Sequence, residues 1–189
     1  MTTPRVIGVD LSLASAGIAT PSRSFTTGCS LPRDAGDVER CERIAAIRDV
    51  VLAECGSWEP NARPWGRTAD LVVVEGFSFG SPQGATEAGG LGWAVRIALH
   101  QAGVPFAVVP PPTLKKYATG SGAAGKDDMK LAALSRLGVE FTGAGSGDRC
   151  DAEWLRVMGL DALGCPVVEM PAVNRSALEK VAWPQAVTT

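Results

Sequence analysis

Four acidic residues stand at places in the sequence that favour chemistry over simple packing. Asp10 and Glu75 each end a short apolar run, where an ionised side chain needs a partner or a metal. Asp148 and Asp151 are three residues apart at the start of an expected helix, so their side chains project from the same face. Sites in open parallel sheets lie at the carboxyl ends of the strands. Asp10 and Glu75 therefore converge if their strands are neighbours, and a helix start that crosses this edge brings the other two acids.

Such a cluster of carboxylates needs a counter-charge. Two unit charges about 5 Å apart repel by roughly 3 kcal/mol at an effective dielectric constant of 20. Oxygen ligands favour Mg²⁺ or Mn²⁺, and two such ions about 3.5 to 4 Å apart can activate a water and stabilise the leaving oxygen of a phosphodiester. The implied chemistry is metal-assisted hydrolysis of a nucleic-acid backbone.

Each of these acids also has a structural interpretation. Asp148 fits a helix N-cap and Asp151 a first-turn acid favoured by the helix dipole. Asp10 fits a turn. Glu75 has no capping role after its β-branched run, and this residue shifts the balance toward a shared site.

The elements that must position these acids form an α/β pattern. Period-two and unalternating apolar runs predict strands, and apolar positions at helical spacing predict helices. The expected strands are residues 5–10, 15–19, 22–28, 70–75 and 106–109, and the expected helices are 34–55, 88–102, 127–137, 148–163 and 174–181. The three prolines at 110–112 are expected to stop the last strand. We expect a mixed, mainly parallel five-stranded sheet with helices on both faces.

Composition narrows the classes of protein. The chain has 189 residues, 46% of them hydrophobic, with a formal net charge of −2, which suits a core-forming protein and disfavours a histone-like binder. No apolar stretch is long enough for a membrane span, and no signal peptide is apparent, so we expect a cytoplasmic protein. The five cysteines lack metal-site spacing and are expected to be buried thiols. The single histidine, His100, is expected to be a core or surface residue.

Four segments in this order resemble the RuvC family of Holliday junction resolvases, within the RNase H-like superfamily. These segments are residues 6–19, 71–75, 113–129 and 148–152, and the resemblance runs from about residue 5 to 163. It implies an RNase H-like domain at 1–164, followed by a tail at 165–189. It also implies that Asp10, Glu75, Asp148 and Asp151 are the catalytic acids that bind Mg²⁺ or Mn²⁺, two ions per site. A homodimer that nicks a four-way DNA junction symmetrically is the implied assembly, in line with the two-fold axis that paired cuts require.

The resemblance also extends to residues that would contact DNA. Lys115, Lys116, Lys126 and Lys130 match lysines near the scissile phosphate, although Asp127 and Asp128 leave a solvated mixed-charge helix face as an alternative. Phe77 and Phe79 are candidates to wedge between or stack on bases. In the family the aromatic residue usually stands three positions after the glutamate, where this chain has Ser78, so core packing of the two phenylalanines is equally open. Trp154 is expected to pack against the sheet.

The glycine-rich helix around residues 89–93 is the expected dimer contact, with ordinary helix-on-sheet packing as the alternative. Three other functions stay open at this stage: a nuclease for flaps, forks or RNA-containing duplexes, an actin-like nucleotide-binding domain suggested by residues 6–10, and a junction-binding protein without catalysis. The sequence identifies no partner helicase for branch migration.

Overall fold

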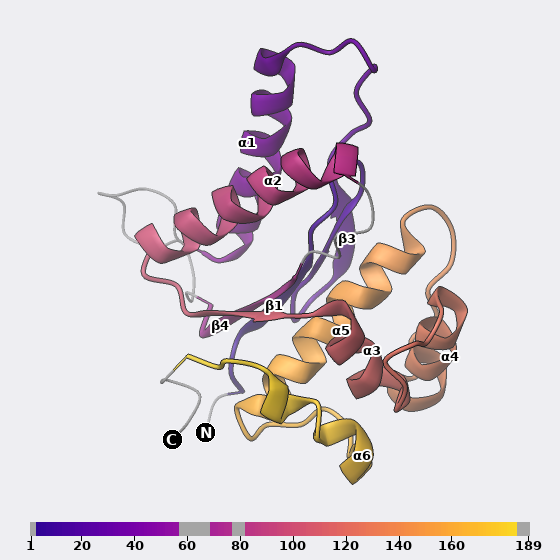
Figure 1. Ribbon diagram of the computed structural model, residues 1–189. Coiled ribbons are helices and arrows are strands. Elements are labelled where there is room, and N and C mark those ends of the chain that lie inside the picture. Colours follow the sequence, from indigo (N-terminus) through magenta and orange to yellow (C-terminus); the bar gives the residue numbers. More distant parts are fainter. Residues whose placement is uncertain (1–2, 57–68, 77–81, 185–189) are drawn as a thin grey trace.

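The computed structural model describes residues 3–56, 69–76 and 82–184, with the backbone alone for 82–85. The order of elements is strand-rich at the start and helical at the end (Figure 1). The strands are β1 Val6–Asp10, β2 Ala16–Ala19, β3 Ser24–Thr27, β4 Leu71–Glu75 and β5 Phe106–Val109. The helices are α1 Asp37–Glu54, α2 Pro82–Gln101, α3 Pro111–Thr119, α4 Lys126–Leu137, α5 Ser146–Ala162 and α6 Ala172–Arg175, followed by a 3₁₀ turn at Leu178–Lys180.

The strands form one five-stranded sheet in the order β3-β2-β1-β4-β5. β2 is antiparallel to both β1 and β3, whereas β4 is parallel to β1 and to β5. Four of the strands therefore point the same way, and their carboxyl ends lie along one edge. The register pairs Val9 with Val74 across β1 and β4, so the last residues of these two strands are side by side. The mixed sheet predicted from the sequence is confirmed.

Helices cover both faces of this sheet (Figure 1). Alternate residues of β1 and β4 enter two separate cores: Val6 and Val73 face α5, α3 and α4, whereas Ile7 and Val72 face α1 and α2. Both faces of β4 are thus buried, which explains its unalternating apolar run. Trp154 of α5 is fully buried in the first core and its indole nitrogen donates to the Met129 carbonyl, so the expected packing of this residue is confirmed.

Two glycines bring α5 unusually close to the sheet. A Cβ at Gly8 of β1 would overlap the backbone oxygen of Ala152, and a Cβ at Gly17 of β2 would overlap the backbone oxygen of Asp148. Because every other residue carries a Cβ, only glycine permits this approach at the two positions. The first turns of α5 are therefore fixed directly over β1 and β2.

Helix α3 differs from the sequence prediction, because residues 110–112 were expected only to stop β5. Instead, Pro110 is the N-cap and the following prolines occupy the first positions of the helix. Proline is tolerated there, since the first N–H groups of a helix have no intrahelical acceptor. α2 likewise begins at Pro82, before the expected start at residue 88.

The segment after α5 packs back onto α3 and α5. Asn174 donates to the Tyr117 carbonyl at 2.7 Å, and the Arg175 guanidinium lies 3.0 Å from the buried carboxylate of Asp161. Asp161 also accepts a hydrogen bond from the Tyr117 hydroxyl. The single helix expected over 174–181 is replaced by α6 and the 3₁₀ turn, which share the segment.

The thiols only partly match expectation. Cys55 and Cys150 are buried, but Cys29, Cys41 and Cys165 are exposed, so the prediction of five buried thiols is wrong for these three. Cys29 and Cys165 lie in connecting segments, and Cys41 is exposed near the start of α1. All five are free thiols. No described helix combines the length and apolar character that crossing a membrane requires.

Candidate functional site

Asp10 and Glu75 meet at the carboxyl edge of the sheet. They are the last residues of β1 and β4, which are adjacent and parallel. Asp10 is only 7% exposed, and its carboxyl group shares a hydrogen bond with the carboxyl group of Glu75. Burial raises the pKa values of both groups, and the contact between them raises the pKa of Asp10 further while it opposes the rise at Glu75.

Helix α5 brings the second pair of acids to the same edge. Gly145 is the N-cap of α5, so Asp148 lies in the first turn and is not the cap that the structural interpretation required. Asp151 is one turn further on, beyond the first turn in which that interpretation placed it. The close contact at Gly17 sets the height of this helix start above β2. The charges of both acids raise the pKa of Glu75, and the charge of Asp148 raises that of Asp10.

The four acids form one electrostatic cluster with too much negative charge. Burial is the first cause that raises the pKa of Asp151 to about 7, and repulsion by Asp10 and Asp148 adds to it. Burial, together with Asp151 and Asp148, raises the pKa of Glu75 to about 7 despite its hydrogen bond with Asp10. Burial, followed by the charge and hydrogen bond of Glu75 and by the charge of Asp148, raises the pKa of Asp10 well above its usual value. A cation between these carboxylates would reverse these shifts.

Two of the four candidate lysines face this cluster. Lys115 of α3 lowers the pKa values of Glu75 and Asp151, and Lys126 of α4 lowers those of Asp10 and Asp151. Lys126 also lies against the first turn of α5, where its Nζ would be 3.7 Å from a Cβ at residue 147.

The other two candidate lysines are not among the main charges that shift the pKa values of these acids. The charge of Lys130 lowers the pKa of the Cys150 thiol, against the larger effect of burial, and Lys116 lies in the last turn of α3. Phe77 and Phe79 lie outside the described residues. His100 is exposed on α2, so of the two expected places, core or surface, the structure shows the surface.

The donor chemistry of the cluster fits a hard divalent cation. All four side chains offer carboxylate oxygens, and the raised pKa values of Asp10, Glu75 and Asp151 indicate negative charge that lacks compensation. Within the described ranges, no three His, Cys, Asp or Glu side chains already lie as ligands of a single ion. Carboxylate oxygens are ligands of Mg²⁺, which commonly keeps several waters and also binds substrate phosphates.

Sequence reasoning missed two features that build the site. α3, which carries Lys115, was hidden by the prolines at its start, although proline in the first turn is itself a helix-start signal. The close approach of α5 at Gly8 and Gly17 was not predicted. Isolated glycines within strands do signal close backbone approach, but the partner helix is visible only after folding.

The sheet order and the two helical layers fit an RNase H-like α/β fold. The chain is 28% identical over 140 residues to the crossover junction endodeoxyribonuclease RuvC of Synechococcus sp. (strain WH7803), covering 72% of this chain and 85% of that relative. No protein-family model matches the chain. The chain is thus similar in sequence to a RuvC protein and shares the fold of RuvC structures.

Solved structures with the same fold include two of RuvC from Thermus thermophilus. The structure of that protein superposes with a TM-score of 0.58 at 20% identity, covering 88% of this chain and 99% of that one. The same protein in complex with a Holliday junction substrate gives a TM-score of 0.55 at 19% identity, covering 80% and 91%. Both matches show that this chain shares the fold of that protein.

Proposed function

We propose that this chain is a divalent-metal-dependent endodeoxyribonuclease that resolves four-way DNA junctions by paired symmetric nicks. The observation that carries the proposal is the group of four carboxylates from β1, β4 and α5 at one edge of the sheet. The similarity to RuvC proteins, one of them described with a Holliday junction substrate, supports the choice of DNA substrate.

In this proposal Asp10, Glu75, Asp148 and Asp151 would hold Mg²⁺ or Mn²⁺, with two ions per site. The metal would lower the pKa of a bound water and neutralise charge on the phosphodiester. Asp10 and Glu75, fixed by the sheet, orient the site, and α5 sets the position of the other two acids. Lys115 and Lys126 would attract the phosphate and hold it against the carboxylates.

The assembly proposed for paired nicks is a homodimer formed through α2. Trp93 and Ile97 are 62% and 50% exposed, and they line an apolar cavity of about 380 Å³ with Phe106 and Val108 of β5. Leu91 of α2 is fully buried in the core between this helix and the sheet, so the alternative of helix-on-sheet packing holds for that residue. Trp93 remains the candidate contact from the expected segment.

Two further parts of the proposal concern the chain and its location. We keep residues 1–164 as the nuclease domain and 165–189 as a tail, whose contact with the domain is supported by the Arg175–Asp161 ion pair. A cytoplasmic location suits the free thiols.

A cleavage assay on a synthetic four-way junction, a flap and a linear duplex tests the activity. We expect symmetric paired nicks on the junction with Mg²⁺ or Mn²⁺, none in chelator, and slower cleavage of the other substrates. Asp10→Asn should reduce cleavage by at least about 100-fold while junction binding and folding persist. Asp127→Asn, an exposed acid on α4, is the matched control and should cleave normally.

Each contrary outcome identifies a different protein. Equal cleavage of flaps or forks would select the broader nuclease alternative. Junction binding without cleavage in either metal would select a non-catalytic binder. Full activity of Asp10→Asn would remove the proposed role of the carboxylate cluster.

A further inference from the structure

A second basic site lies between α1 and α2, outside the acidic cluster. A cavity of about 600 Å³ opens there, and the residues that line it are Leu31, Pro32, Arg33, Arg40, Arg43 and Glu87. Three arginines against one glutamate give the cavity a formal charge of +2. A chain whose net charge is −2 therefore concentrates positive charge at this place.

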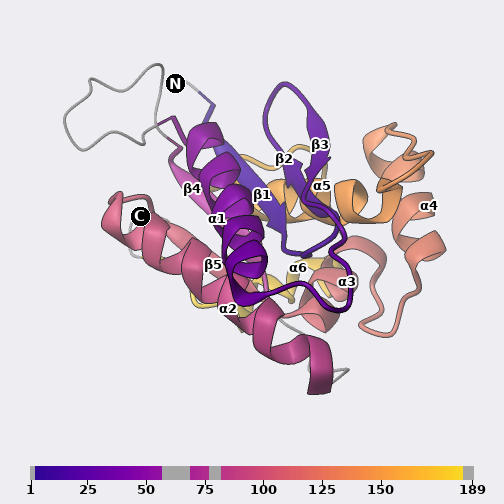
Figure 2. The ribbon, with the colours of Figure 1, turned by 90° about the horizontal axis from the view of Figure 1, so that it is seen from above.

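The topology puts this cavity at the edge of the sheet that holds the acids. β3 runs in the same direction as β1, so the connection that follows it, with Arg33, leaves from the carboxyl edge. α1 starts from that connection, and α2 follows β4, whose last residue is Glu75. The cavity thus lies on the α1 and α2 side of the edge, whereas α3 and α4, with Lys115 and Lys126, lie on the opposite side (Figures 1 and 2).

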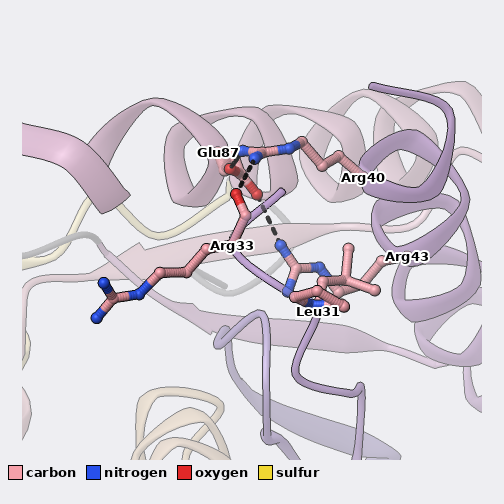
Figure 3. Close-up of a pocket in the computed structure, with 6 residues that line it drawn as sticks. Leu31, Arg33, Arg40, Arg43 and Glu87 are labelled. Carbon is pink, nitrogen blue, oxygen red and sulfur yellow. Dashed lines mark hydrogen bonds and ion pairs between the residues drawn. The ribbon is translucent and has the colours of Figure 1, made fainter. Parts of the chain in front are cut away.

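Two arginines of α1 converge on one carboxylate of α2 (Figure 3). Arg43 donates through Nη2 to Glu87 Oε2 at 2.6 Å, and Arg40 donates through Nη1 to the other oxygen of Glu87. The Arg43 side chain is only 10% exposed, and its Nε is buried without a hydrogen-bond acceptor among the described residues. One carboxylate therefore balances two guanidinium groups, and one buried donor is left unsatisfied.

Backbone contacts hold these two guanidinium groups in place. Arg40 Nε donates to the Ala35 carbonyl at 3.0 Å, and Arg43 Nη1 donates to the Cys29 carbonyl at 3.2 Å. Arg33, in contrast, is exposed, has no partner for its guanidinium among the described residues and extends away from Glu87 (Figure 3). The cavity thus has two guanidinium groups held by contacts and a third, that of Arg33, with no partner among the described residues.

We propose that this cavity binds a backbone phosphate of a DNA arm, beyond the phosphate at the acidic cluster, and that Glu87 competes with that phosphate for Arg40 and Arg43. The planar guanidinium fork suits phosphate as well as carboxylate, and contacts to phosphate set the register of a protein on DNA. The inference rests on the proposed function, because the phosphate belongs to the substrate DNA. It extends the DNA path across the α1 and α2 side of the sheet edge.

Salt-dependent binding of a labelled four-way junction by the full chain, measured in chelator, tests the inference. Glu87→Gln removes the competing charge, so junction affinity should rise and the salt slope should steepen. Arg33→Gln should weaken binding and reduce the slope by about 0.9, which is about a threefold change between 50 and 200 mM salt. Glu179→Gln and Arg136→Gln alter the net charge equally at surface positions outside the cavity, and they serve as matched controls.

The cavity has no role in DNA binding if Glu87→Gln matches Glu179→Gln, or if Arg33→Gln matches Arg136→Gln, while the wild type binds and cleaves the junction. Failure of the wild type to bind or cleave any branched DNA would instead overturn the proposed function. Arg33→Gln removes no contact within the described structure, so its result does not depend on the stability of the Glu87 ion pairs.

Discussion

Replacing Asp151 by asparagine should stabilise the metal-free protein. The pKa of Asp151 is raised from 3.8 to about 7, so ionising this carboxyl in the folded protein above pH 7 costs up to about 4 kcal/mol. Asparagine keeps the shape but not the charge, and its own buried amide loses about 1 to 3 kcal/mol of solvation. We therefore expect the free energy of unfolding at pH 8 in chelator to rise by about 1 to 3 kcal/mol.

The sign of the pH dependence follows from the same shift. Between pH 4 and 7 the folded state keeps a proton on Asp151 that the unfolded chain has lost, so wild-type stability falls as pH rises through this window. The gain of Asp151→Asn over the wild type should accordingly be smaller at pH 5 than at pH 8. Adding Mg²⁺ should stabilise the wild type, by roughly 2.7 kcal/mol at 100 times its dissociation constant, and the variant less.

Urea denaturation followed by circular dichroism, at pH 5 and pH 8, with chelator and with Mg²⁺, measures these differences. Asp127→Asn is the control. This exposed acid in the first turn of α4 interacts favourably with the helix dipole, so its loss should lower the free energy of unfolding by a few tenths of a kcal/mol. If Asp151→Asn destabilises the metal-free protein at pH 8, or if its effect is independent of pH, the argument from charge repulsion is wrong.

Two other substitutions test the geometry and the assembly. Gly17→Ala should force the start of α5 outward by about 1 Å. The free energy of unfolding should fall by about 1 to 3 kcal/mol in denaturation, and the single-turnover rate of junction cleavage should fall about 100-fold. Gly89→Ala is the control: nothing lies within 4 Å of the new Cβ, so this change should stabilise the protein by up to about 1 kcal/mol. Wild-type stability and cleavage of Gly17→Ala would contradict the close contact between β2 and α5. Trp93→Glu should leave folding within about 0.5 kcal/mol of the wild type but yield monomers in sedimentation and abolish paired nicks. Leu131→Glu, 65% exposed on α4, is its control, and a Trp93→Glu dimer with paired nicks would rule out the α2 interface.

The parts of this architecture that the sequence predicts are those that leave a pattern within one segment. The unalternating run before Glu75 marks a strand buried on both faces, and Val72 and Val73 do enter opposite cores. The spacing of Asp148 and Asp151 marks one helix face. The α3 helix escaped prediction because a proline run that ends a strand can equally begin a helix, and local sequence does not separate the two outcomes.

The sequence alone determined the strands and most of the helices, and it singled out the acids, because side-chain periodicity and strand ends are properties of contiguous residues. Only the tertiary structure decided that Asp10 is buried against Glu75, that α5 lies on Gly8 and Gly17, and that Arg40 and Arg43 share one carboxylate of α2. These features depend on contacts between segments far apart in the chain. Their energies arise from desolvation and charge proximity, which exist only once the two helical layers enclose the sheet.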